Sequence, residues 1–336
     1  MLPRLFRRLV LTMHRRAAIR ALGLLPLAWT LPGKAADKYP AGPVRMIVPF
    51  PPGGTTDANG RIIAQALAQA LGGNMVVENI AGAAGTIGTA QAKRAKPDGY
   101  TLLFGNISTQ AISAGLYPDL PYDPLKDFAP IAHTGKLVNL LVVHPSLGVK
   151  SVPELIAYAK ANPGKLSYGS SGIGGTPHLS AELFKQRTGT DMVHIPYKGG
   201  GPMLADLLGN QVQLSFANLP DLLPHVRAGK LIALGVTSRE RWPSVPDIPS
   251  IQEQGVPDFD MTSWMGLFAP ARVPAPIREQ LVQATLDVQK KPEVIHRLSE
   301  LGFVEEPMGG EAFSAYVAQQ VKFWSTFVKT AGIKAE

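Results

Sequence analysis

The stretch at residues 43–61 reads Pro-Val-Arg-Met-Ile-Val-Pro-Phe-Pro-Pro-Gly-Gly-Thr-Thr-Asp-Ala-Asn-Gly-Arg. Residues 44–48 predict a short strand, the proline and glycine residues predict a turn, and Thr55, Thr56 or Asp57 can cap the helix that follows. Such a turn presents free backbone N–H groups at a helix N-terminus, where an anion is favoured. The stretch therefore predicts an α/β unit that carries an anion site.

The same alternation of strand and helix continues along the chain. Because strands that alternate with helices form parallel sheets covered on both faces, the fold class is predicted to be α/β. About 300 residues follow the N-terminal segment, and chains of this length often divide into two domains. The further predicted strands are at 75–77, 101–104, 137–143, 166–168, 193–196, 212–216, 231–236 and 263–268.

Two more glycine-rich loops, at 82–88 and 170–178, also join a strand to a helix start. One such turn alone is usually a simple connection, but three in one α/β chain favour a ligand cleft at the carboxyl ends of the strands. A helix N-terminus carries about half a positive charge, so several together can hold a carboxylate without arginine or lysine. Glycine is needed where the backbone must approach the ligand closely.

The N-terminal segment, residues 1–35, has the pattern of a secretory signal peptide. Basic residues precede a short apolar run at 21–31, and small residues at 33–35 offer a cleavage site near Ala35. We therefore expect the periplasm as the location. Arg15-Arg16 leaves Sec and twin-arginine export both open, and an uncleaved anchor is the alternative to cleavage.

Most of the apparent basicity lies in this segment. The whole chain has 33 basic and 25 acidic residues, while residues 1–35 hold seven basic and no acidic residues. The rest of the chain therefore has 26 basic against 25 acidic residues, a net charge of +1. Nothing in this balance indicates a nucleic-acid partner. The chain has no cysteine, which excludes disulfides and cysteine-ligated metal.

The usual catalytic and cofactor patterns do not match. Residues 169–172 do not fit the nucleophile elbow of hydrolases, and Gly53-Gly54 is not followed by the lysine of a phosphate loop. The histidines lack zinc-site spacing, so we expect no metal, no cofactor and no enzymatic activity. His178 follows a predicted helix cap at Thr176, and a structural role and a ligand contact are equally open for it.

An ordered series of short motifs resembles the Bug-type substrate-binding proteins of tripartite tricarboxylate transporters. The resemblance extends over essentially the whole chain after the N-terminal segment. Its motifs are Val-Pro-Phe-Pro-Pro-Gly-Gly-Thr-Thr-Asp (48–57), Val-Glu-Asn (77–79), Gly-Ala-Ala-Gly-Thr-Ile-Gly (82–88), Pro-Asp-Gly-Tyr-Thr-Leu (97–102), Ser-Ser-Gly-Ile-Gly-Gly-Thr-Pro-His-Leu (170–179), Tyr-Lys-Gly (197–199) and Leu-Leu-Gly-Asn-Gln-Val (207–212).

The resemblance implies a two-lobed periplasmic-binding-protein fold of type II, with a mostly parallel sheet in each lobe. Lobe 1 is expected at 36–138 and 258–336 and lobe 2 at 139–257, with hinges near 137–142 and 257–263. A monomer is expected to close on a small carboxylated ligand and deliver it to the membrane permease subunits. The implied ligand-binding residues are Pro52, Gly53, Gly54, Thr55, Asp57, Gly85, Thr86, Ser170, Thr176, His178, Tyr197 and Asn218.

One position departs from the family pattern. Relatives often carry Asp before Asn-Leu-Pro, whereas here Ala217 precedes Asn218. A lost carboxylate removes a partner for a ligand amine, so we hypothesise a plain di- or tricarboxylate or an aromatic acid as the ligand. Two other function classes stay open: a periplasmic sensor that acts on a receptor kinase, and an exported hydrolase.

Overall fold

The structure, a computed structural model, describes residues 39–335. The predicted signal peptide, its cleavage near Ala35 and the question of twin-arginine export lie outside the described residues. Within them, the predicted alternation of strands and helices is confirmed, with differences in strand length and direction. A single path of hydrogen-bonded strands, β2-β1-β3-β9-β4-β7-β5-β6, connects the two halves of the sheet through β4.

The first group of strands is β1, β2 and β3, and it begins with the stretch at residues 43–61. Strand β1 lies between β2 and β3 and is parallel to both, as predicted. Helix α2 follows β1 directly and buries Ile63 and Leu67, four residues apart on one face. The elements are β1 (Val44–Val48), α2 (Thr55–Leu71), β2 (Met75–Asn79), the turn η1 (Ala83–Gly85), α3 (Thr86–Lys93), β3 (Thr101–Asn106), the π-helical turn η2 (Ser108–Ile112) and α4 (Ser113–Leu116).

The second group repeats this design. Strand β5 pairs in parallel with both β6 and β7. Ser151 caps helix α5, since its hydroxyl accepts a hydrogen bond from the backbone N–H of Glu154 at 3.3 Å. The elements are η3 (Pro145–Leu147), α5 (Val152–Ala161), β5 (Ser167–Ser170), α6 (Thr176–Thr188), β6 (Val193–Pro196), α7 (Gly200–Leu208), β7 (Leu214–Asn218), α8 (Leu219–Arg227) and β8 (Ile232–Val236).

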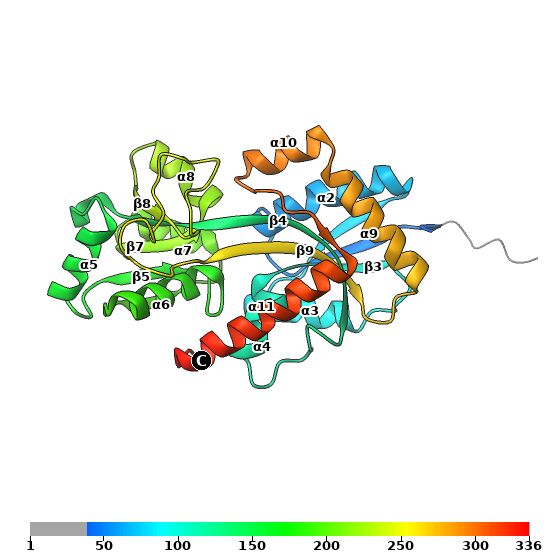
Figure 1. Cartoon of the computed structure of the whole chain (residues 1–336), viewed down its shortest axis with the longest axis horizontal. Coiled ribbons are helices and arrows are strands. Elements are labelled where there is room, and N and C mark those ends of the chain that lie inside the picture. Colours follow the sequence, from blue (N-terminus) through cyan, green and yellow to red (C-terminus); the bar gives the residue numbers. More distant parts are fainter. Residues whose placement is uncertain (1–38, 336) are drawn as a thin grey trace, which may run out of the picture. The chain divides into compact units, whose positions relative to one another are not determined.

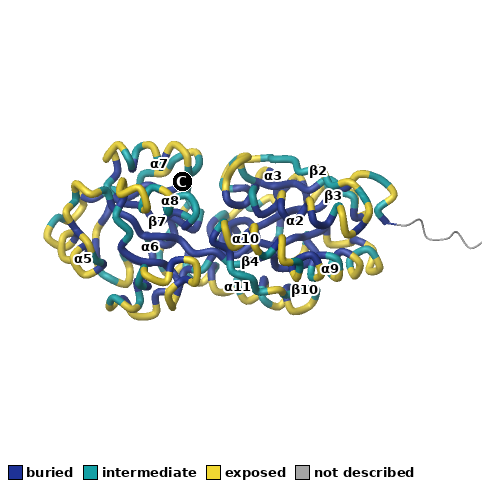
Figure 2. The backbone as a smooth tube through the Cα atoms, turned by 90° about the horizontal axis from the view of Figure 1, so that it is seen from above, coloured by how far each residue is buried: buried dark blue, intermediate teal, exposed yellow. Residues whose placement is uncertain are grey.

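Two long strands connect the groups. Strand β4 (Phe128–Val143) pairs antiparallel with β9 (Thr262–Pro270) over most of the length of β9, and the two run side by side across Figure 1. The sequence predicted only the second half of β4 and did not predict that β4 and β9 run antiparallel to their neighbours. These strands are almost wholly buried, as the dark blue tube along β4 in Figure 2 shows for the first of them, so no polar–apolar alternation marks them.

A threonine joins the two connecting segments. The Thr237 hydroxyl donates to the carbonyl oxygen of Met261 at 2.8 Å, lies 3.1 Å from the carbonyl oxygen of Asn139, and accepts from the Asn139 N–H at 2.9 Å. Asn139 lies on β4 and Met261 immediately precedes β9. Both residues fall inside the predicted hinge ranges 137–142 and 257–263, which stay a prediction.

The C-terminal helices return to the first group. Helix α9 contacts α2, and α11 contacts α4 and η2. On α11, Phe313, Val317 and Trp324 are buried, and their spacing places them on one face of the helix. Within residues 39–335, no helix combines the length and apolar character that crossing a membrane requires. The C-terminal elements are α9 (Ala275–Gln289), α10 (Pro292–Glu300), β10 (Met308–Gly309) and α11 (Gly310–Thr330).

Candidate functional site

The first glycine loop begins α2 without a side-chain cap. Gly54 is the N-cap residue, so the prediction that Thr55, Thr56 or Asp57 caps the helix is wrong. Pro52, Gly53 and Gly54 are exposed in the loop, and no atom lies within 4 Å of the place where a Cβ on Gly53 would stand. The open space beside Gly53 and the uncapped start of α2 leave room for an anion beside backbone N–H groups.

Asp57 holds the shape of this loop from inside. Its carboxylate accepts hydrogen bonds from the Gly53 N–H at 2.9 Å, from Arg61 Nε at 2.9 Å and from Asn79 Nδ2 at 2.8 Å. Burial alone raises the pKa of the Asp57 carboxyl, but the bonds from Arg61, Gly53 and Asn79 bring it below its usual value. Asp57 is therefore placed to position the loop, and the Gly53 N–H is already engaged by it.

The second glycine loop packs against the first. Four successive residues, Gly82 to Gly85, have positive φ, including the non-glycine residues Ala83 and Ala84. Such strain persists where the surroundings enforce it. Gly85 has a φ of +92°, and a Cβ there would stand 2.6 Å from Thr109 Cγ2 and 3.2 Å from the Pro49 carbonyl oxygen, so this position favours glycine. The Thr86 hydroxyl donates to the Ala83 carbonyl oxygen at 2.8 Å and closes the turn.

Asn106, at the carboxyl end of β3, joins the first loop and was not among the residues expected from the sequence. Its Nδ2 lies 3.3 Å from Thr56 Oγ1, and its Oδ1 accepts from the Ser108 N–H at 3.0 Å. The residue thus connects the first loop to η2. A polar side chain at the end of a buried parallel strand was the signal for it, because ligands bind at that edge of the sheet.

The third glycine loop is held by two stacked imidazoles. His178 and His194 have ring centroids 4.1 Å apart, and His194 also stacks on Tyr168. His178 Nδ1 accepts from the Gly174 N–H at 3.2 Å, and His194 Nε2 lies 2.6 Å from the hydroxyl of Ser170. These contacts place Ser170 and His178 in the support of the loop. Their contact with a ligand stays a prediction.

This buried stack predicts a loss of stability in acid. Burial lowers the pKa of both His178 and His194 to about 4 from an ordinary 6.5. The unfolded chain therefore binds more protons between pH 6.5 and 4, so the stability is complete above about pH 6.5 and falls as the pH drops through that window. A fall in pKa of this size is equivalent to about 3 kcal/mol for one imidazole at the acid limit.

Denaturant unfolding at pH 7.5 and pH 4.5 measures this difference. In His194→Phe the difference between the two pH values should shrink, whereas His296→Gln should change it much less, because the pair of His296 with Glu300 on α10 is exposed and such pairs contribute little. An equal pH dependence in wild type and His194→Phe would contradict the assignment to the stack.

Two further predicted residues direct their hydroxyls into the protein. Tyr197 donates to Asp206 Oδ2 at 2.7 Å, and Thr176 donates to Asn139 Oδ1 at 3.4 Å. Thr176 is the first residue of α6, while Gly175 is its N-cap residue, so the predicted cap at Thr176 is wrong. Both side chains support neighbouring elements, and a ligand contact by either stays a prediction.

The first loop meets the second group of strands at Asn218 and Asp221. Thr55 Oγ1 donates to Asp221 Oδ1 at 3.2 Å and accepts from Asn218 Nδ2 at 3.2 Å. Asn218 ends β7 and Asp221 lies in the first turn of α8, more than 160 residues from Thr55 in sequence. Pro52, Gly53, Gly54, Thr55 and Asn218 are therefore brought to one place.

The sequence did not point to Asp221, because an acidic partner for the ligand was expected only at position 217, which is Ala217 here. The structure places a carboxylate beside Asn218 after all, three residues farther along the chain. The reasoning from Ala217 therefore no longer argues against a ligand that carries an amine. The signal in the sequence was an acidic residue in the first helical turn after a predicted strand.

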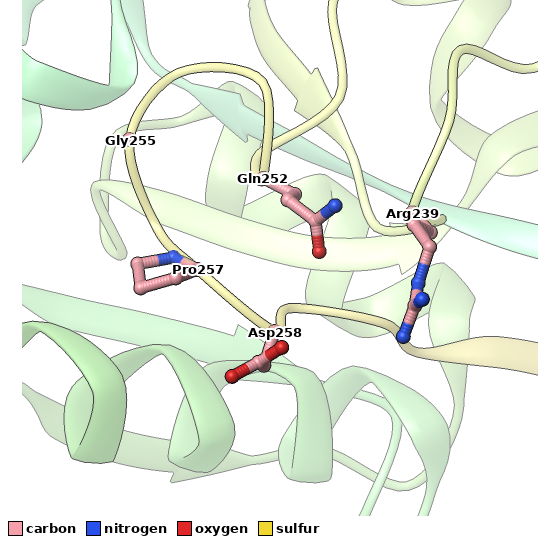
Figure 3. Close-up of a pocket in the computed structure, with 5 residues that line it drawn as sticks. All are labelled: Arg239, Gln252, Gly255, Pro257 and Asp258. Carbon is pink, nitrogen blue, oxygen red and sulfur yellow. The ribbon is translucent and has the colours of Figure 1, made fainter.

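Two cavities lie away from these loops. One, of about 400 Å³, is lined by Arg239, Gln252, Gly255, Pro257 and Asp258 (Figure 3). The other, of about 810 Å³, also includes Pro257 and Asp258 and lies between α6 and α11. Neither contains a residue of the glycine loops. Among residues 39–335, no group of three or more His, Asp or Glu side chains is arranged to hold a metal ion.

Comparison with known proteins gives a consistent result. Residues 60–333 match the family described as "Tripartite tricarboxylate transporter family receptor". The chain is 36% identical to protein BugT of Bordetella pertussis over 301 residues, which cover 89% of this chain and 92% of BugT. Among solved structures, an R. palustris protein with adipate is 37% identical with a TM-score of 0.83, and the matched region covers 88% of this chain and 99% of that one.

Similar solved structures also identify the fold. The periplasmic binding protein BugD is 35% identical with a TM-score of 0.81, and the match covers 89% of this chain and 100% of BugD. The mixed sheet of the described residues, with its two parallel groups and flanking helices, is thus the two-lobed fold of periplasmic binding proteins. The chain belongs to the receptors of the tripartite tricarboxylate transporter family.

Proposed function

We propose that this receptor captures a small carboxylated organic compound between its glycine loops and delivers it to the membrane permease subunits of a tripartite transporter. The observation that carries the proposal is the meeting of the first loop with Asn218 and Asp221 beside uncapped helix N–H groups. The similar protein solved with adipate, a dicarboxylate, supports this ligand class.

The proposed mechanism is a shift between open and closed states. Lobe 1 comprises 36–138 and 258–336, and lobe 2 comprises 139–257. The chain bends where β4 and the segment before β9 pass from one lobe to the other. A ligand that contacts both lobes only when they are closed favours the closed state by its differential affinity. The contacts of Thr55 with Asn218 and Asp221 join one lobe to the other in this scheme.

We also propose that the protein is a monomeric, periplasmic receptor without enzymatic activity. Ser170 and His194 form the kind of pair that hydrolases use, at 2.6 Å. However, Ser170 is fully buried at 0% exposure, and its hydroxyl also donates to the Gly172 carbonyl oxygen. A buried serine that holds its own loop is poorly placed to attack a substrate.

A thermal-shift screen over organic acids tests the proposal. A ligand that binds only the folded state stabilises it by about 2.7 kcal/mol at a hundredfold excess over Kd. We expect at least one small di- or tricarboxylate to raise the melting temperature by several degrees. Its neutral amide serves as the matched control and should give no shift. A panel in which no carboxylate shifts the melting temperature would overturn the proposed ligand class.

A further inference from the structure

The carboxylate of Asp221 has acceptor capacity that the protein does not fill. Its two oxygens offer about four lone-pair positions, whereas only Thr55 at 3.2 Å and Asn218 at 3.4 Å use them. No salt bridge to Asp221 is formed within residues 39–335. Burial raises the pKa of the carboxyl, although the bonds from Thr55 and Asn218 act in the opposite direction. A further hydrogen-bond donor would stabilise the ionised form.

The position of this carboxylate is next to the proposed anion site. Thr55, which donates to Asp221, is the first residue of α2 and follows Gly53 and Gly54. On the other side, Asp221 Oδ2 lies 3.9 Å from where a Cβ on Gly200 would stand, at the start of α7. Asp221 thus lies between two glycine-rich helix starts, within the reach of a small molecule held by the first loop.

An acidic group beside an anion site constrains the ligand. A second ionised carboxylate of the ligand at this point would meet like charge, which is unfavourable when both groups are partly desolvated. A hydroxyl or ammonium group would instead donate to Asp221. Burial of a polar acceptor without a donor is costly, so a site built around such a group discriminates strongly against ligands that lack the donor.

We propose that Asp221 is a specificity-determining residue that accepts a hydrogen bond from the ligand, so that this receptor prefers hydroxy- or amino-carboxylates to plain dicarboxylates of the same length. This inference rests on the proposed function, because it assigns a second contact within the same site. Asn218 and Thr55 orient the Asp221 carboxylate for that contact.

Calorimetry with succinate, malate and aspartate tests this inference. The three have the same carbon skeleton and differ only in bearing no donor, a hydroxyl or an ammonium group. We expect malate or aspartate to bind the wild-type receptor at least tenfold more tightly than succinate. The ligand that binds more tightly of the two shows whether a hydroxyl or an ammonium group donates to Asp221. Equal affinity for all three, or tightest binding of succinate, would overturn the inference.

The matched variant is Asp221→Asn, which keeps the shape of the side chain but replaces one acceptor oxygen by a donor group. We expect it to lose at least tenfold in affinity for the preferred ligand and to change less than threefold for succinate. Asp287→Asn, on the exposed surface of α9, is the control and should change neither. An unchanged preference in a folded Asp221→Asn variant would also overturn the inference.

The two proposals fail in distinguishable ways. If none of these acids and no other carboxylate binds, the proposed ligand class is wrong. If carboxylates bind but the donor group makes no difference, the ligand class stands and the role of Asp221 is wrong. If Asp221→Asn does not fold, the wild-type series can still overturn the inference, because it compares ligands on one protein.

Discussion

Replacement of Gly88 by alanine is expected to lower the free energy of unfolding by about 3 kcal/mol and to weaken ligand binding. A Cβ at this position of α3 would collide with the carbonyl oxygen of Ile80 and would stand 2.9 Å from Pro49 Cα. Both obstacles are backbone atoms, so no side chain can rotate away to relieve the contact. Because Pro49 leads into the first glycine loop, the displacement would reach the proposed ligand site.

Denaturant unfolding of Gly88→Ala and Gly201→Ala compares a crowded helical glycine with an open one. No atom lies within 4 Å of the place where a Cβ on Gly201 would stand in α7. Gly201→Ala is therefore expected to be neutral or slightly stabilising, because alanine has the better helix propensity. Similar unfolding midpoints for Gly88→Ala and wild type would show that α3 can move away from Pro49 at little cost.

Replacement of Asp57 by alanine is expected to weaken ligand binding at least tenfold and to cost about 3 kcal/mol of stability. The change leaves the Gly53 N–H and Asn79 Nδ2 without the carboxylate that they now share. Asn79 keeps its bond to the Phe50 carbonyl oxygen, but the loop between Phe50 and Gly53 loses its internal anchor. The helix start would then no longer be held in one shape for the anion.

Arg61→Ala separates the ion pair from the loop anchor. The Arg61 side chain is 49% exposed, so its bond to Asp57 should contribute less than about 1 kcal/mol. Calorimetry and thermal unfolding of both variants should therefore show a large loss for Asp57→Ala and a small one for Arg61→Ala. Equal losses would assign the effect to the ion pair, and unchanged affinity in Asp57→Ala would remove Asp57 from the support of the site.

The local design of the chain could be predicted from the sequence. Strand β1 and the glycine-rich turn that leads into α2 follow from signals within a few residues. The wrong cap predicted at Thr176 has a non-local cause. Thr176 has the residue type of a helix cap, but its hydroxyl is used by Asn139 on β4. A non-local partner thus took precedence over the capping preference.

The direction of the connecting strands could not be predicted. Strands β4 and β9 are buried along nearly their whole length, and such strands look alike whether they are parallel or antiparallel. Their pairing joins residues more than 120 positions apart, such as Leu137 with Ser263. Pairings at this distance depend on how the two groups of strands fold together, which no window of sequence records.

The sequence by itself determined that three glycine-rich loops start helices, because glycine and proline act through the backbone of their own neighbourhood. Only the tertiary structure decided which polar groups those loops meet. Thr55 reaches Asp221 across 166 residues, and His178 on α6 stacks on His194 of β6. Side chains acquire such partners from the packing of the whole sheet, and for that reason Asp221 became visible only in the folded protein.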